Sequence, residues 1–293
     1  MGPTVAVGFG GINGWYALSW ASDYVGRTGG TLVLCHAYVP AASASDGVCF
    51  PTGSAWDTAV AQGVTATRNR LGAEHVRLRM EPVPVVELLL DAASTADLVV
   101  VGPPEAKPRP RHPSTAHEVA GRAHGPVVVA RRGGGRDHGA FAGHVVVGVD
   151  GHSQAALEFA FVKASTLGTP LAALHVTGDR RQDYWFDEEM RTTHCAAPPA
   201  AVELLAREIE SWELKYPDVA VKRAVFGGSP PAGLIRASRG AALLVVGRSR
   251  RTVASARLGS VAGRAIESAD APVATVPDWM AFGPAASSSD VAG

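Results

Sequence analysis

The strongest candidate for chemistry in this chain is the stretch LLVVGRSRRTVASARLGSVAGRA, residues 243 to 265. An apolar run ends at Gly247, and an arginine-rich loop then leads to Gly259 and Ser260. A glycine lets a ligand approach the backbone without a Cβ, and the first amides of a helix that begins at Ser260 would face an anion. We therefore expect a phosphate-binding loop, although the arginines of this stretch could equally form a solvated face.

Other candidate residues stand at the ends of two apolar runs in the same half of the chain. VVVGVDG ends with Gly148, Val149 and Asp150, and LAALHVTG ends around His175 and Val176. Parallel α/β sheets bind ligands at the carboxyl ends of their strands, so these residues should meet in one crevice. Asp150 could accept hydrogen bonds from hydroxyl groups or hold magnesium, or it could cap the next helix. For the two strand-end histidines, His175 and His36, we favour a packing role over catalysis.

The elements that would position these residues occur twice. Four apolar blocks recur after 139 to 146 residues: VAVGFGG as VVVGVDG, LVLCHAYV as LAALHVTG, ADLVVVG as AALLVVG, and GPVVVARR as APVATVPD. A nearly constant offset over four blocks indicates a duplication. We expect one domain over residues 1–132, a flexible glycine-rich linker over 133–143, a second domain over 144–279, and a frayed tail over 280–293.

Each copy alternates apolar runs with helical patterns. Apolar runs without polar alternation are typical of parallel strands that are covered on both faces. Residues 200–216 place apolar side chains three and four positions apart, which predicts an amphipathic helix. The order of strands and helices predicts an α/β fold with two tandem, doubly wound parallel sheets. The insertion 179–199 has an aromatic centre and could be a lid, a partner contact or a surface loop.

Composition excludes several classes of protein. Basic and acidic residues balance at 27 each, so we expect no recruitment of nucleic acid or of an anionic membrane. No apolar run is long enough to suggest a membrane span, and no segment resembles a signal peptide. The three cysteines, Cys35, Cys49 and Cys195, form neither a disulfide framework nor a metal-binding pair, and Cys35 should lie in the core. We expect a cytoplasmic protein that holds no metal of its own.

The second copy resembles a universal stress protein domain, from VVVGVDGHSQAALEFA through LLVVGRSRRTVASARLGSVAGRAIESADAPVATVP. The whole chain resembles a tandem member of that family, with an adenine nucleotide alpha hydrolase-like fold. The resemblance implies binding of ATP, with or without Mg²⁺, in the second copy. Asp150 would face the ribose and Val176 the adenine. The phosphates would lie at Gly247 and at Gly259, Ser260 and Val261, and Gly148, Val149, Ser249 and Arg250 complete the expected nucleotide site.

The chain departs from the family's signature in both copies. In the second copy Arg250 replaces a glycine, and eight residues instead of nine separate it from Gly259. The guanidinium could block the loop or bind the anion itself. In the first copy Gly10 stands in place of Asp150, and prolines fill the loop 102–116. Prolines remove amide donors, so we expect the first copy to have lost the pocket and to serve a structural role.

Three functions remain open. The favoured one is a non-catalytic regulatory protein of the stress response that binds an adenine nucleotide in its second domain. The alternative is an interaction module in which both sites are lost, with protein partners that the sequence does not name. An enzyme of nucleotidyl transfer or hydrolysis is disfavoured, because no nucleophile stands beside a base. The two copies should pair as an internal pseudo-dimer, and two chains could pair as a homodimer.

Overall fold

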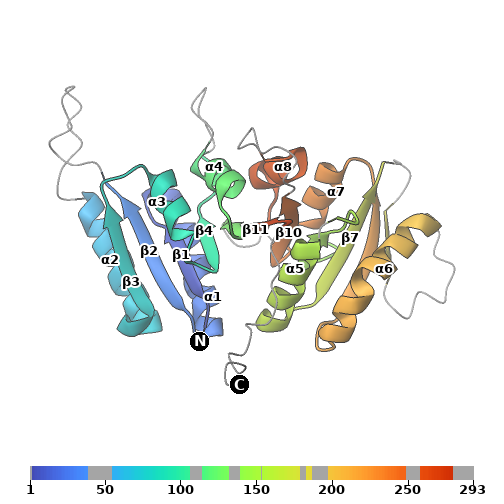
Figure 1. The fold of residues 1–293 in the computed structure, drawn as a ribbon, viewed down its shortest axis with the longest axis horizontal. Coiled ribbons are helices and arrows are strands. Elements are labelled where there is room, and N and C mark those ends of the chain that lie inside the picture. Colours follow the sequence, from blue (N-terminus) through green and yellow to red (C-terminus); the bar gives the residue numbers. More distant parts are fainter. Residues whose placement is uncertain are drawn as a thin grey trace, which may run out of the picture.

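The computed structural model describes residues 2–38, 55–105, 114–131, 139–152, 154–178, 183–186, 197–248 and 258–279. Within these residues eleven strands form one sheet, in the order β3-β2-β1-β4-β5-β11-β10-β6-β7-β9-β8. Helices cover both faces of this sheet along its length (Figure 1). Inside each copy the strands pair in parallel, except that β8 at the edge of the second copy pairs antiparallel with β9. This parallel-dominated sheet with its helices confirms the predicted α/β class.

The first copy alternates strands and helices as its sequence predicts. Its elements are β1 (Thr4–Gly8), α1 (Gly11–Thr28), β2 (Thr31–Ala37), α2 (Ala55–Leu71), a 3-10 turn (Ala73–His75), β3 (Val76–Glu81), α3 (Val85–Ala92), β4 (Leu98–Val101), α4 (Thr115–Arg122) and β5 (Val127–Val129). The central strands are apolar throughout because helices bury both of their faces.

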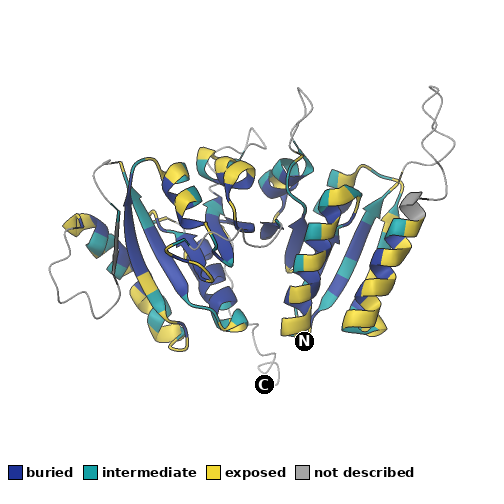
Figure 2. Cartoon of the chain, turned by 180° about the vertical axis from the view of Figure 1, so that it is seen from behind, coloured by how far each residue is buried: buried dark blue, intermediate teal, exposed yellow. Residues whose placement is uncertain are grey.

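The second copy repeats this order and adds one strand. Its elements are β6 (Val145–Gly148), α5 (Gln154–Leu167), β7 (Leu171–Thr177), β8 (Tyr184–Phe186), α6 (Pro199–Lys215), β9 (Val221–Gly227), α7 (Pro230–Ala237), β10 (Leu243–Arg248), α8 (Ser260–Ser268) and β11 (Val273–Pro277). The helix predicted over 200–216 is α6, which buries Leu205 and Ile209. The outer faces of the helices stay exposed while the strands are buried (Figure 2).

The two copies join through their last strands. β5 pairs antiparallel with β11, and Val127 and Val129 lie opposite Thr275 and Val273. All four residues are fully buried, so this seam continues the core instead of forming a surface contact. The predicted internal pseudo-dimer is therefore confirmed, and pairing with a second chain stays a prediction.

Two arginines, the half-buried Arg131 and the buried Arg248, cross the seam in opposite directions. Arg131, which follows β5, donates to the carbonyl of Ile266 at the end of α8. Arg248, which ends β10, donates to the carbonyls of Gly121 and Ala123 at the end of α4. Carbonyls at a helix C-terminus carry partial negative charge, which favours a cation. Each copy thus supplies a cation to the C-terminal end of a helix in the other copy. These contacts help to set the orientation of the two copies relative to each other.

A buried amine lies between α5 and α1. The ammonium of Lys163 donates to the Tyr24 hydroxyl and lies 4.4 Å from the centre of that ring and 4.8 Å from the ring of Phe159. Only 8% of Lys163 is exposed. Burial lowers the pKa of Lys163 to about 8 and raises the pKa of Tyr24 to about 12. The protonated Lys163 is therefore a buried charge between the two copies, and its burial lowers the stability of the folded state.

Two predicted surface segments are partly built into the fold. The linker predicted over 133–143 is not flexible at its end, because Phe141 is 1% exposed and stacks on Phe226 at 5.9 Å. Within the insertion 179–199, β8 pairs antiparallel with β9 and extends the sheet, so this part is an edge strand. The rest of the linker, most of the insertion and the tail 280–293 lie outside the described residues.

Cys35 lies in the core as predicted, with 1% of its surface exposed. Burial raises the pKa of its thiol to about 11, so the thiolate form is disfavoured. Cys49 and Cys195 lie outside the described residues.

In the described part of the chain no helix combines the length and apolarity that crossing a bilayer requires. Those same residues contain no group of three or more His, Cys, Asp or Glu side chains that could hold a metal ion.

Candidate functional site

The strand register brings most of the predicted site residues of the second copy to one edge of the sheet. Val147 pairs with Ala173 of β7 on one side and with Val245 of β10 on the other. Gly148, the last residue of β6, and the two residues after it therefore lie beside the tips of β7 and β10, where Val176 and Gly247 lie. Helices α4 and α8 begin at this same edge, the upper one in Figure 1.

In each copy a histidine side chain forms a hydrogen bond with a backbone carbonyl at this edge. The Nδ1 atom of His175 lies 2.8 Å from the carbonyl oxygen of Val149, and Nδ1 of His36 lies 2.9 Å from that of Phe9. A carbonyl only accepts hydrogen bonds, so Nδ1 carries the proton in both contacts. These histidines hold the tips of neighbouring strands together, as expected for packed residues.

Gly148 and Val176 both pack against helix α7. A Cβ on Gly148 would lie 3.2 Å from the side chain of Leu234, and a Cβ on Gly233 would lie 2.8 Å from that of Val176. Gly148 thus packs closely against Leu234, and the side chain of Val176 is turned toward α7. A contact between Val176 and an adenine ring would use its backbone, and it stays a prediction.

The Asp150 side chain stabilises a turn at the edge of the site. Its Oδ1 accepts from the amide of His152 at 2.9 Å, and Gly151 between them adopts a φ of 84°. The side chain is exposed at the strand tip. This contact closes a turn ahead of α5, which begins at Gln154, and does not cap that helix. The role of Asp150 toward a ribose or magnesium stays a prediction.

The start of α8 differs from the start of α4, its counterpart in the first copy. Gly259 is the N-cap of α8 and supplies no side-chain hydrogen bond. In α4 the N-cap is Ser114, whose hydroxyl accepts from the amide of His117 at 3.3 Å and lies 2.8 Å from its Nδ1. The first amides of α8, around Ser260 and Val261, are therefore not capped from within, whereas α4 caps itself.

The structure corrects the role of the first arginine of the loop. Arg248 is 7% exposed, and its guanidinium lies 4.9 Å from the ring of Trp279 besides donating to the carbonyls at the end of α4. It belongs to the seam and to neither a phosphate site nor a solvated face. Burial lowers its pKa to about 10. Arg264 is exposed on α8, whereas Ser249, Arg250 and the rest of the loop lie outside the described residues.

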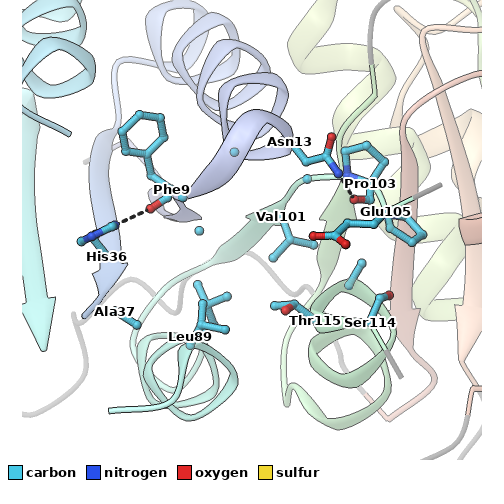
Figure 3. A pocket seen from close by; sticks show the side chains of 17 residues that line it. Phe9, Asn13, His36, Ala37, Leu89, Val101, Pro103, Glu105, Ser114 and Thr115 are labelled. Carbon is cyan, nitrogen blue, oxygen red and sulfur yellow. Dashed lines mark hydrogen bonds between the residues drawn. The ribbon is translucent and has the colours of Figure 1, made fainter. Parts of the chain in front are cut away.

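The first copy contains a cavity of about 550 Å³ at the equivalent edge (Figure 3). It lies between the tips of β1, β2 and β4 and the starts of α1 and α4. Asn13 donates its side-chain amide to the carbonyl of Pro103 at 3.0 Å, and a Cβ on Gly102 would lie 2.3 Å from the backbone oxygen of Asn13. The first copy therefore keeps a cavity at this edge, and its expected loss of the anion-accepting pocket stays a prediction. The strand-tip glycines Gly8, Gly10 and Gly102 were the signal for this cavity.

Comparison with known proteins identifies the family. The model of the universal stress protein family matches residues 3–131 and 142–277, which are the two copies. The chain belongs to the universal stress protein family. It is a tandem member, with one universal stress protein domain in each half.

Relatives and solved structures agree with this assignment. A universal stress protein of Mycolicibacterium smegmatis is 30% identical over 89% of this chain and 92% of its own length. A universal stress protein of Mycobacterium tuberculosis is 31% identical over 70% of this chain and 69% of its own. A solved universal stress protein of Archaeoglobus fulgidus superposes with a TM-score of 0.62 at 14% identity, and covers 94% of this chain and 96% of that one. The last comparison supports the tandem fold alone.

Proposed function

We propose that this universal stress protein is a non-catalytic regulatory protein of the stress response whose second domain binds an adenine nucleotide, ATP with Mg²⁺. The observation that carries the proposal is the start of α8, where the N-cap Gly259 gives the first amides no side-chain cap, at the edge that holds Gly247 and Asp150. Uncapped amides and the positive end of the helix dipole favour a phosphate. Cys35, a free buried thiol, fits a reducing compartment such as the cytoplasm.

A substitution at the N-cap tests the proposal. Gly259 has a φ of −59°, and a Cβ there meets nothing within 4 Å, so other residues fit without strain. Gly259→Asp would cap α8 from within and place a carboxylate at the proposed phosphate position. Two like charges about 4 Å apart repel by roughly 1 to 4 kcal/mol, from water to a partly buried setting. We expect at least a tenfold loss of Mg·ATP affinity by calorimetry.

The matched control is Gly259→Ala, which adds a Cβ but neither a cap nor a charge. It should keep Mg·ATP affinity within about threefold of the unchanged protein, since the amides stay open. Folded protein that binds no Mg·ATP at millimolar concentration would contradict the proposal. Equal loss in both variants would also contradict it, because bulk rather than charge would then be the cause.

A second candidate function is an interaction module that has lost both nucleotide sites. The contact between Asp150 and the amide of His152 favours it, because the carboxylate is then used by its own turn. A thermal melt separates the two functions. A ligand at 100 times its dissociation constant stabilises the folded state by about 2.7 kcal/mol, so saturating Mg·ATP should raise the melting temperature only if the second domain binds it.

A further inference from the structure

Strand β3 forms the outer edge of the sheet in the first domain. It pairs with β2 on one side, and among the described residues no strand covers its other side. Figure 1 shows β3 at the end of the sheet, beside α2. The backbone N–H and C=O groups along such an edge can pair with a strand of another chain.

The second domain covers the equivalent edge with a strand of its own. His36 of β2 lies beside Met80 of β3. Its counterpart in the duplication, His175 of β7, lies beside Val225 of β9, so β9 corresponds to β3. In the second domain β8 pairs antiparallel with β9, with Tyr184 opposite Val225. This edge of the fold therefore accepts an antiparallel strand.

The backbone of β3 presents its outward groups at Leu78 and Met80. The carbonyl of Glu81 accepts from the amide of Tyr38, which follows β2, so the backbone groups of Glu81 face β2. The N–H and C=O of one residue point to the same side of a strand, and this side alternates along the chain. The backbone groups of Met80 and Leu78 therefore face away from β2, where a further strand would lie.

Leu78 and Met80 also expose apolar side chains at this edge. They are 40% and 41% exposed, whereas Arg223 and Val225, at the corresponding positions of β9, are 4% and 1% exposed. An added strand would take part of this apolar surface out of water, and burial stabilises by about 25 cal/mol for each Å².

The opposite face of β3 carries three charged side chains. Since side chains alternate between the faces of a strand, Arg77, Arg79 and Glu81 share this face. Arg79 forms ion pairs with Glu81 and with Asp91 of α3. Arg77 is exposed and forms no ion pair with any residue that the structure describes. A carboxylate on an incoming strand would complete this face.

A second β3 strand supplies the matching groups. In an antiparallel pair centred on Arg79, each Leu78 lies opposite Met80 of the other chain. Each Arg77 lies opposite Glu81 of the other chain. Apolar pairs and opposite charges directly across a strand pair are stabilising. The two Arg79 side chains meet at the centre, where each already pairs with two carboxylates of its own chain.

We propose that two chains of this protein associate through β3, as an antiparallel strand pair centred on Arg79. The seam strands β5 and β11 already pair with each other inside one chain, so they offer no edge to a second chain. Pairing of β3 with itself uses the same surface on both chains, and it therefore gives a closed dimer and no filament.

Charge reversal tests both the surface and the register. Full-length protein is followed by analytical ultracentrifugation from about 1 μM to about 500 μM, since an interface of one strand pair is small and belongs with transient complexes. We expect the unchanged protein to form dimers in this range. Arg77→Glu alone and Glu81→Arg alone should each weaken the dimer about tenfold, because like charges then face each other at two places.

An equimolar mixture of these two variants places opposite charges at both positions again. It should regain an affinity within about threefold of that of the unchanged protein. A dimer that neither variant weakens, or a mixture that associates no more tightly than the variants alone, would overturn the proposal. Unchanged protein that stays monomeric over the whole range would overturn it as well.

A proline substitution tests the backbone pairing separately. Leu78→Pro removes the outward amide, and proline is tolerated at an edge where the amide faces solvent, so the protein should stay folded and dimerise about tenfold more weakly. Leu78→Val is the matched control, because it keeps the amide and should stay within about threefold of the unchanged protein. Circular dichroism and the melting temperature check the fold. Folded Leu78→Pro protein that dimerises as tightly as Leu78→Val would contradict pairing through β3.

Discussion

Lys163 provides a test of the energetics at the seam between the domains. Its pKa falls from 10.5 to about 8 because burial disfavours the ammonium. One pKa unit corresponds to about 1.36 kcal/mol, so the folded state loses about 3 kcal/mol by carrying this charge below pH 8. Three contacts offset part of this cost in stability, at about 1 kcal/mol each. The ammonium contacts the rings of Tyr24 and Phe159 and donates to the Tyr24 hydroxyl.

The sign of the pH dependence follows from proton binding. Between pH 8 and 10.5 the unfolded chain keeps the proton of Lys163 while the folded protein has released it. The free energy of unfolding therefore rises with pH in this window. Lys163→Met removes the titrating group, so the stability of the unchanged protein relative to this variant should rise by about 2 to 3 kcal/mol from pH 7 to pH 10.

Urea denaturation at several pH values, followed by two coincident probes, measures this difference. The difference between the two proteins cancels most other titrating groups. Lys222→Met serves as the control, since Lys222 is exposed and its removal takes no charge out of the interior. A difference between the unchanged protein and Lys163→Met that stays constant with pH, or that falls as pH rises, would refute the reasoning.

Three further predictions concern residues that the tertiary structure revealed. Arg248→Met should cost about 1 to 3 kcal/mol in urea denaturation because it leaves two carbonyls at the end of α4 without this donor, one of them buried, whereas Arg264→Met at an exposed position should cost under about 0.5. Phe141→Ala should cost about 3 to 5 kcal/mol of stability if the end of the linker is core, and a loss under 1 would show that it is not. Gly102→Ala should lower the melting temperature because its Cβ would lie 2.3 Å from a backbone oxygen. Gly263→Ala, with nothing within 4 Å, should raise it, and a rise in both would contradict the geometry.

The two domains of this chain share one frame at the strand tips. Both domains keep the strand-tip glycines and the contact between a histidine and a strand-end carbonyl. They differ where a ligand's charge would lie: Ser114 caps α4, whereas Gly259 leaves α8 open. Two domains with the same fold can therefore differ at the few loop positions where a binding site would lie.

The sequence by itself determined the repeat, the order of strands and helices, the core position of Cys35 and the edge where the site residues meet. These follow from apolar periodicity and from glycines at strand ends, which are local signals. Only the tertiary structure decided where Arg248, Phe141 and Lys163 point and that the first domain keeps a cavity. Arg248 contacts a helix end more than 120 residues away in the chain, and Lys163 contacts a tyrosine of the other domain. Their roles depend on neighbours that the seam brings together, and no pattern of nearby residues encodes them.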